Sequence, residues 1–253
     1  MEVYMEGIEL LVDLHKEGLR QGPGSEITTL KALELMRLPP GGPFRMAELG
    51  CGTGAASLAL AAALDVQITA VDLFPEFLDV LVERARQRSV SDRITTQACS
   101  MDDLPFPAET FDMIWSEGAV YNIGFEQGVA YWHRFLRPGG FLAVSEIIWL
   151  APNPPLEIQG HWDVEYPEMG TASAKMDILE RHGYAPTGFF VLPQDCWTKE
   201  YYDPLQQRTP AFLKRHNHSA EAREIVEAEK KEIDLYQRYQ DWFSYGFFVA
   251  RKV

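Results

Sequence analysis

The stretch RMAELGCGTGAASLALAAAL, residues 45–64, places three glycines at alternate positions between an apolar run and an alanine-rich run. Glycine lets the backbone approach a ligand closely and adopt positive φ, so this segment predicts a tight turn between a buried strand and a helix. In doubly wound sheets, ligands bind at the carboxyl ends of the strands, near the switch in strand order. The turn at Gly50, Gly52 and Gly54 is therefore the first candidate for a ligand site.

The spacing of these glycines, G-x-G-x-G, differs from the G-x-G-x-x-G that is typical of a dinucleotide pyrophosphate site. A pyrophosphate needs a helix N-terminus aimed at it, whereas a ligand without phosphate needs only a bend that it can cross. Asp72 ends the next apolar run, VQITAVDL, about 20 positions after the glycines. Its carboxylate can accept hydrogen bonds from both hydroxyls of a ribose. The segment therefore favours a nucleoside without a phosphate chain.

Apolar and amphipathic runs alternate after residue 43, and this alternation predicts a parallel sheet with helices on both of its faces. Strands are expected at residues 44–50, 66–73, 93–99, 111–118, 141–148 and 244–252, with a further strand beginning near 186. Helices are expected at residues 7–19, 25–38, 55–64, 75–88, 125–136 and 171–184, and over most of 203–242. Proline and aromatic residues at 151–169 predict an active-site loop, and the charge run at 221–234 predicts a solvated helix face.

Composition excludes several functional classes. The formal net charge of −14, from 23 basic and 37 acidic residues, makes a nucleic-acid partner a poor expectation. The three cysteines are widely spaced and fit neither a metal site nor a disulfide framework, so no metal is expected. The longest unbroken apolar run, residues 58–64, is too short for membrane insertion, and MEVYMEGIEL lacks the basic start of a signal peptide. We therefore expect a cytoplasmic protein.

Four segments carry a family resemblance: AELGCGTG (47–54), AVDL (70–73), SMDDLPFPAETFDMIWSE (100–117) and RPGGFLAVSE (137–146). In order and spacing they resemble the class I S-adenosylmethionine-dependent methyltransferases. GPGS (22–25) and IWSEGAVYNIGF (114–125) further resemble bacterial small-molecule methyltransferases of the ubiquinone/menaquinone type. The resemblance implies a Rossmann-like, doubly wound α/β fold with a mostly parallel seven-stranded sheet, an antiparallel last strand, N-terminal helices and a helical insertion before that strand.

The same resemblance implies a single domain, with a helical cap at 1–43, a cofactor-binding core at 44–150 and a substrate side at 151–253. It implies S-adenosyl-L-methionine as cofactor and S-adenosyl-L-homocysteine as product. It assigns cofactor contacts as follows: Gly50, Cys51 and Gly52 to the methionine part, Asp72 to the ribose, Leu73, Ser100 and Met101 to the adenine, and Glu117 to the amino group or the substrate. Ser100 departs from the family, since many relatives have an aspartate there.

A general base is needed only if the methyl acceptor is protonated, and Glu117, His161 and Tyr121 are the candidates. Cys51 is expected to be a small buried residue rather than a nucleophile. Aromatic side chains can steady the cationic sulfur and line the acceptor pocket. The pool is Tyr4, Phe125, Trp149, Trp162, Tyr166, Trp197, Tyr201 and Tyr202.

The expected reaction is methyl transfer to a small-molecule acceptor. A non-methylating enzyme that binds S-adenosylmethionine and a cofactor-binding sensor remain alternatives on the same scaffold, and a dinucleotide oxidoreductase is the least favoured. Single residues also have plainer interpretations, since Asp72 could start a helix and Glu117 could cap the loop after its strand. The sequence leaves open whether two copies form a homodimer.

Overall fold

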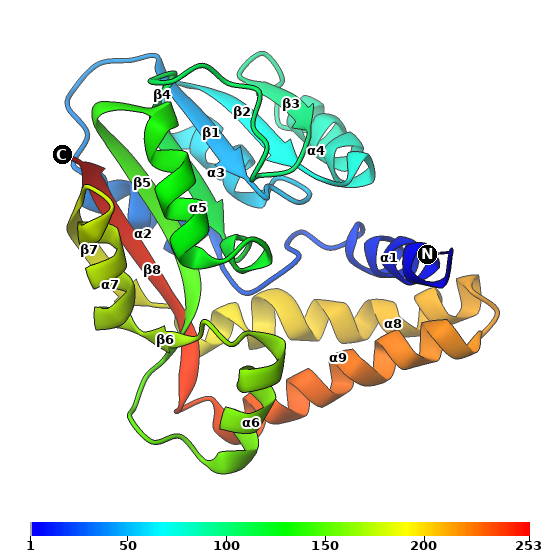
Figure 1. Ribbon diagram of the computed structural model, residues 1–253. Helices are drawn as coiled ribbons and strands as arrows, with labels where there is room; N and C mark the ends of the chain where they lie inside the picture. Colours follow the sequence, from blue (N-terminus) through cyan, green and yellow to red (C-terminus); the bar gives the residue numbers. More distant parts are fainter. Residues whose placement is uncertain (1) are drawn as a thin grey trace.

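The computed structural model describes residues 2–253, with side chains described from Gly7 onward. Its centre is an eight-stranded sheet of order β3-β2-β1-β4-β5-β8-β7, with β6 beside β5 (Figure 1). The strands are β1 (Phe44–Leu49), β2 (Val66–Asp72), β3 (Ile94–Ala98), β4 (Phe111–Glu117), β5 (Leu136–Trp149), β6 (Gly170–Thr171), β7 (Tyr184–Val191) and β8 (Phe243–Lys252). The helices are α1 (Glu2–His15), α2 (Glu26–Met36), α3 (Ala55–Ala63), α4 (Pro75–Gln87), α5 (Phe125–Trp132), α6 (Leu156–Glu165), α7 (Ala172–Arg181), α8 (Asp203–Arg215) and α9 (Ala220–Tyr239).

The sheet confirms the expected doubly wound α/β architecture. β1 pairs in parallel with both β2 and β4, so the strand order reverses at β1, and β8 pairs antiparallel with both β5 and β7. The sheet has one strand more than the seven that the resemblance implied, and the additional strand is the two-residue β6. Ligands of such sheets bind at the carboxyl ends of the strands beside the reversal, here the ends of β1, β2 and β4.

Two apolar layers hold the sheet between its helices. Along β4, Trp115 faces the layer that contains α3 and α4, whereas its neighbour Ile114 faces the layer that contains α5 and α7. The same alternation occurs in β8, where Phe247 packs on Trp115 and Phe248 packs on Phe125. This period of two follows from the strand pleat, which sends successive side chains to opposite faces.

Local signals in the sequence explain where several helices begin. Ser25 caps α2, since its hydroxyl accepts from the Thr28 N–H while the Thr28 hydroxyl accepts from the Ser25 N–H. α3 begins directly after Gly54, whose φ of 86° requires a residue without a side chain. Both helices start at turns beside the carboxyl end of β1, so they shape the ligand-binding edge.

Three expectations from the sequence are wrong in detail. Residues 156–165 form helix α6 rather than a loop. Three residues of this helix, His161, Trp162 and Glu165, line a cavity beside the end of β4. β5 begins at Leu136 and passes through the Arg-Pro-Gly-Gly segment, five residues before the expected start, because that segment remains extended. The charge run on α9 is not a purely solvent-exposed face, because its residues Glu229 and Glu232 line the same cavity.

Helices α8 and α9 lie together below the strand ends, and α1 packs on both of them (Figure 1). This places the helical insertion next to the ligand-binding edge, as expected for a cover over the site. None of the helices in the described residues is long and apolar enough to span a bilayer.

Candidate functional site

The glycine turn after β1 lies against the ends of β2 and β4, the place where doubly wound sheets have their ligand-binding crevice. Gly50, Gly52 and Gly54 have φ values of 73°, 52° and 86°, a backbone region that other residues rarely adopt. A Cβ at Gly50 would lie 2.4 Å from the Ala119 Cβ and 3.0 Å from the Met101 Cε. The absence of a side chain at Gly50 therefore lets three segments, which follow β1, β3 and β4, approach one another.

Asp72 lies at the end of β2 and is tied to the glycine turn. One carboxylate oxygen accepts from the Gly52 N–H at 2.8 Å and the other accepts from the Phe74 N–H at 3.0 Å. Each oxygen has two lone pairs, so the carboxylate keeps acceptor capacity for further donors. Burial raises the pKa of Asp72, while its bonds to backbone N–H groups oppose that shift.

The remaining predicted cofactor contacts of this region lie on the segments that follow β1, β2 and β3: Cys51, Leu73, Ser100 and Met101. Leu73 is 59% exposed, which is unusual for a leucine and leaves an apolar surface beside Asp72. The Ser100 hydroxyl donates to the carboxylate of Asp102, two positions further along the chain. Met101 is fixed by its carbonyl, which accepts from the Trp132 indole at 2.9 Å. Cys51 is buried, and burial raises the pKa of its thiol well above the ordinary value, which argues against a nucleophile.

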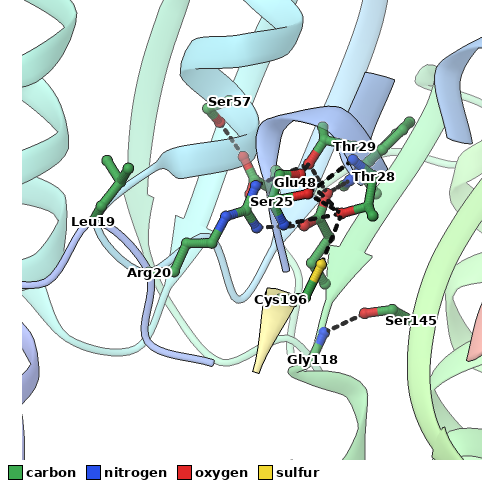
Figure 2. Close-up of polar contacts among 12 residues, drawn as sticks. Leu19, Arg20, Ser25, Thr28, Thr29, Glu48, Ser57, Gly118, Ser145 and Cys196 are labelled. Carbon is green, nitrogen blue, oxygen red and sulfur yellow. Dashed lines mark hydrogen bonds and ion pairs between the residues drawn. The ribbon is translucent and has the colours of Figure 1, made fainter. Parts of the chain in front are cut away.

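Glu117, at the end of β4, is held by three donors. Arg20 forms an ion pair with one oxygen at 2.7 Å, and the other oxygen accepts from the Thr29 hydroxyl at 2.7 Å and the Trp115 indole at 2.8 Å. The next peptide is also anchored, because the Gly118 N–H donates to Ser145 (Figure 2). These contacts stabilise an ionised carboxylate in a fixed orientation, which suits a binding group better than a mobile base.

A buried acid lies beneath this ion pair. Glu48 of β1 accepts a hydrogen bond from Ser57, and burial raises its pKa to about 8 (Figure 2). The negative charge of Glu117 also raises that pKa, whereas Arg20 lowers it. Glu48 is therefore protonated at neutral pH, and Arg20 is left to pair with Glu117.

The segment before α2 crosses from the crevice to the cavity. The side-chain amide oxygen of Gln21 accepts from the Thr53 N–H at 2.8 Å, and a Cβ at Gly52 would lie only 2.1 Å from that oxygen. Arg84 of α4 donates to the Gly18 carbonyl at 3.0 Å and so holds the same segment. Gln21 also lines the main cavity, so one side chain joins the two parts of the site.

A cavity of about 370 Å³ has Gly118, directly after β4, in its wall. It lies between the end of β4 and helices α6 and α9, and its volume falls within the range of small-molecule sites. Its walls include two of the three predicted catalytic residues, Tyr121 and His161, whereas Glu117 contributes only through its neighbour Gly118. From the aromatic pool, the wall contains Trp162, Tyr166, Trp197 and Tyr201.

The environments of the two catalytic candidates differ. Burial lowers the pKa of His161, so its imidazole is neutral at pH 7 and can accept a proton. Desolvation raises the pKa of Tyr121, so its hydroxyl stays protonated and can donate a hydrogen bond. The Tyr121 ring packs edge-on against the Tyr166 ring with 6.2 Å between the ring centroids, and the His161 ring packs against the Trp162 ring with 4.9 Å between centroids. The other aromatic candidates belong to the core or its margin, and the side chain of Tyr4 lies outside the described residues.

Sequence reasoning missed several residues of the site: Arg20, Gln21, Glu165, Glu229, Lys231 and Glu232. One signal was present, since Val226, Glu229, Ile233 and Tyr236 recur at helical spacing on one face of α9. A glutamate on an otherwise apolar face marks a buried acid. The remaining members are single polar residues whose positions depend on how distant elements pack.

The crevice has the chemistry of a nucleoside site without phosphate. It offers an acceptor for hydroxyl groups at Asp72 and an exposed apolar surface at Leu73. These features fit S-adenosylmethionine, in which a ribose links an adenine to a methionine. Among the described residues, no group of three histidine, cysteine, aspartate or glutamate side chains could hold a metal ion.

Comparison with known proteins agrees with this geometry. Residues 46–140 match a family described as methyltransferase domain. Among curated relatives, 27-O-demethylrifamycin SV methyltransferase from Amycolatopsis mediterranei is 29% identical over 116 residues, which cover 44% of this chain and 40% of the relative. The chain thus matches less than half the length of the first such relatives.

Two solved structures share the fold over nearly the whole chain. A SAM-dependent methyltransferase from Geobacter sulfurreducens in complex with S-adenosyl-L-homocysteine has a TM-score of 0.80 and 19% identity, covering 92% of this chain and 94% of that one. The [4+2]-cyclase SpnF has a TM-score of 0.78 and 19% identity, covering 99% and 94%. The fold therefore hosts more than one kind of reaction.

Proposed function

We propose that this chain, whose residues 46–140 match a methyltransferase domain, transfers a methyl group from S-adenosyl-L-methionine to a small-molecule acceptor. The observation that carries the proposal is that Gly50 packs on Ala119, which directly follows the cavity residue Gly118. A donor in the crevice and an acceptor in the cavity would meet at the end of β4. S-adenosyl-L-homocysteine is the expected product.

In the proposed complex, the cofactor residues would act through position. Asp72 would accept from the ribose hydroxyls, Leu73 and Met101 would pack on the adenine, and Ser100 would reach its edge. Gly50, Cys51 and Gly52 would give the methionine part room to pass. Glu117 would lie near the cofactor amino group, held in orientation by Arg20.

The cofactor, when bound, supplies a methyl group attached to a positively charged sulfur. The walls of the cavity would hold the acceptor in line with that group, and such positioning can lower a barrier by about 7–11 kcal/mol. The neutral imidazole of His161 would take a proton from an acceptor that has one, and the Tyr121 hydroxyl would orient the acceptor. Buried aromatic side chains would exclude water from the reacting atoms.

Binding and product analysis together test this proposal. Isothermal titration should show that the protein binds S-adenosylhomocysteine, and incubation with S-adenosylmethionine and an acceptor panel should yield S-adenosylhomocysteine and a methylated product. Turnover of an acceptor without S-adenosylhomocysteine would instead support a non-methylating enzyme. Tight cofactor binding without turnover over a broad panel would support a sensor. If neither nucleoside binds, the proposal fails.

A further inference from the structure

The cavity beside the crevice has an excess of negative charge on its wall. Glu229 and Glu232 project from one side of α9 and Glu165 from the end of α6, whereas Lys231 is the only lysine or arginine among its lining residues. His161 does not offset this excess, because its lowered pKa keeps it neutral at pH 7. An anion in this space would face like charges, so the wall favours a positive ligand.

Two buried polar atoms in this wall lack a hydrogen-bond partner among the described residues: the acceptor Glu229 Oε2 and the indole donor of Trp162. The Glu229 side chain is 16% exposed, and its Oε1 lies 3.1 Å from the His15 imidazole. Its Oε2 is buried without a hydrogen-bond partner among the described residues. His15 of α1 and Arg208 of α8 face Glu229 from neighbouring helices, and neither lines the cavity. A buried acceptor without a donor is costly, so its place favours a ligand that donates or carries positive charge.

Two tyrosine hydroxyls point to a ligand independently of the acids. Tyr201 and Tyr245 line the cavity and are each only 7% exposed. Neither hydroxyl hydrogen-bonds to another of the described residues, although buried tyrosines usually find a partner. Nearby Glu232 does have one, since it accepts from the Tyr202 hydroxyl at 2.9 Å.

The aromatic rings of the same wall add a second attraction for positive charge. Trp162, Tyr166 and Trp197 lie among the lining residues, and the faces of such rings attract ammonium groups. Burial and the charge of Glu229 raise the pKa of Glu232 to about 7, so this wall already holds a proton part of the time. A bound cation would replace that proton and favour the ionised carboxylate.

We infer that the methyl acceptor is a small molecule with a positively charged amine or ammonium group, which binds between the α9 glutamates and the aromatic wall. The identification of this molecule as the methyl acceptor rests on the proposed function, whereas the preference of the cavity for a cation does not depend on that function. The positive group would anchor the molecule at the α9 side. The atom to be methylated would then face Gly118 and the crevice.

A matched pair of probes tests the charge preference directly. Choline and 3,3-dimethyl-1-butanol have nearly the same shape, but only choline carries a quaternary ammonium. Titration in the presence of S-adenosylhomocysteine should show choline binding at least about tenfold more tightly, a difference of about 1.4 kcal/mol. Equal affinities, or tighter binding of the neutral alcohol, would overturn the inference.

Variants locate the preference within the cavity. Glu229→Gln and Glu232→Gln should each reduce the ratio of the two affinities several-fold, whereas Glu224→Gln, on the exposed side of α9, should leave it unchanged. A ratio that survives in both cavity variants would place the cation elsewhere and contradict the inference. Titration of S-adenosylhomocysteine alone separates the two proposals, since loss of nucleoside binding refutes the proposed function and leaves the charge preference measurable.

Discussion

The crevice and the cavity are built in different ways, although they meet at Gly118. The crevice comes from turns that directly follow β1, β2 and β3, and its polar groups are largely backbone atoms and one carboxylate. The cavity comes from side chains of α6, α9 and β8, and α6 ends at Glu165, far before α9 begins at Ala220. A short motif can specify the first kind of site, whereas the second depends on how whole helices pack.

The largest expected effect concerns the ion pair at the boundary of the two regions. Arg20→Met would leave Glu117 as an uncompensated buried charge and should destabilise the fold by about 3–5 kcal/mol. Chemical denaturation measures this loss. The double variant with Glu117→Gln should recover much of it, because no charge then remains unpaired. If the single and double variants are equally stable, the pair does not hold the boundary.

A pH series tests the foundation of the crevice. Glu48 has a pKa of about 8 in the folded protein against an ordinary value of 4.5, so the folded state binds its proton more tightly than the unfolded state. The stability that this group contributes is therefore complete below about pH 4.5 and is lost as pH rises through 8. Relative to Glu48→Gln, the wild-type free energy of unfolding should fall between pH 5 and 8, by at most about 1.4 kcal/mol per pH unit.

Urea unfolding of both proteins at four pH values across that range measures this difference. Glu224→Gln, at an exposed position, serves as the control and should follow the wild-type curve. Parallel curves for wild type and Glu48→Gln would show that Glu48 keeps an ordinary pKa. The crevice would then rest on an ionised acid.

A pair of substitutions separates crevice from cavity. Asp72→Ala should weaken S-adenosylhomocysteine binding by about 1–3 kcal/mol, because the ribose would lose a charged acceptor. Asp79→Ala, at an exposed site on α4, is the matched control. Glu232→Gln should leave this affinity unchanged, because Glu232 lies on the acceptor side. Thermal melting of each variant detects any change in stability, since Asp72 also binds the Gly52 N–H. A reversed order of effects would exchange the roles of the two regions.

The smallest effect belongs to the helix that flanks both regions. Ser25→Ala removes the N-cap of α2 and should cost about 1 kcal/mol of stability. Ser25→Gly should lower the free energy of unfolding by only about a few tenths of a kcal/mol, because glycine is tolerated at N-caps. Chemical denaturation of both variants compares them. Similar losses for alanine and glycine would show that the cap acts through other contacts.

The same contrast explains how much could be predicted from sequence. The strands, most helices and the placement of Gly50, Asp72 and Met101 around one crevice follow from local apolar periods and turn residues. The cofactor contacts themselves remain a prediction. Tyr121 and His161, which line the cavity, could be selected from the sequence because they occur in the segments that follow β4 and β5, respectively.

The acceptor side could not be predicted in the same way. Glu229 and Glu232 lie in a charged run whose composition is that of a solvated helix, and only the packing of α9 against the strand ends buries part of it. Arg20 is likewise a single residue in a loop, and its partner Glu117 is 97 positions away. Local patterns carry no information about such pairs, because they depend on tertiary contacts.

The central claim is that the crevice of Gly50 and Asp72 holds the nucleoside and delivers its sulfur to the cavity. A crystal structure of the protein with S-adenosylhomocysteine tests this most directly. The account predicts ribose hydroxyls on the Asp72 carboxylate, adenine between Leu73 and Met101, and sulfur facing the cavity near Gly118. A ligand bound elsewhere, or a ribose that makes no contact with Asp72, would contradict it.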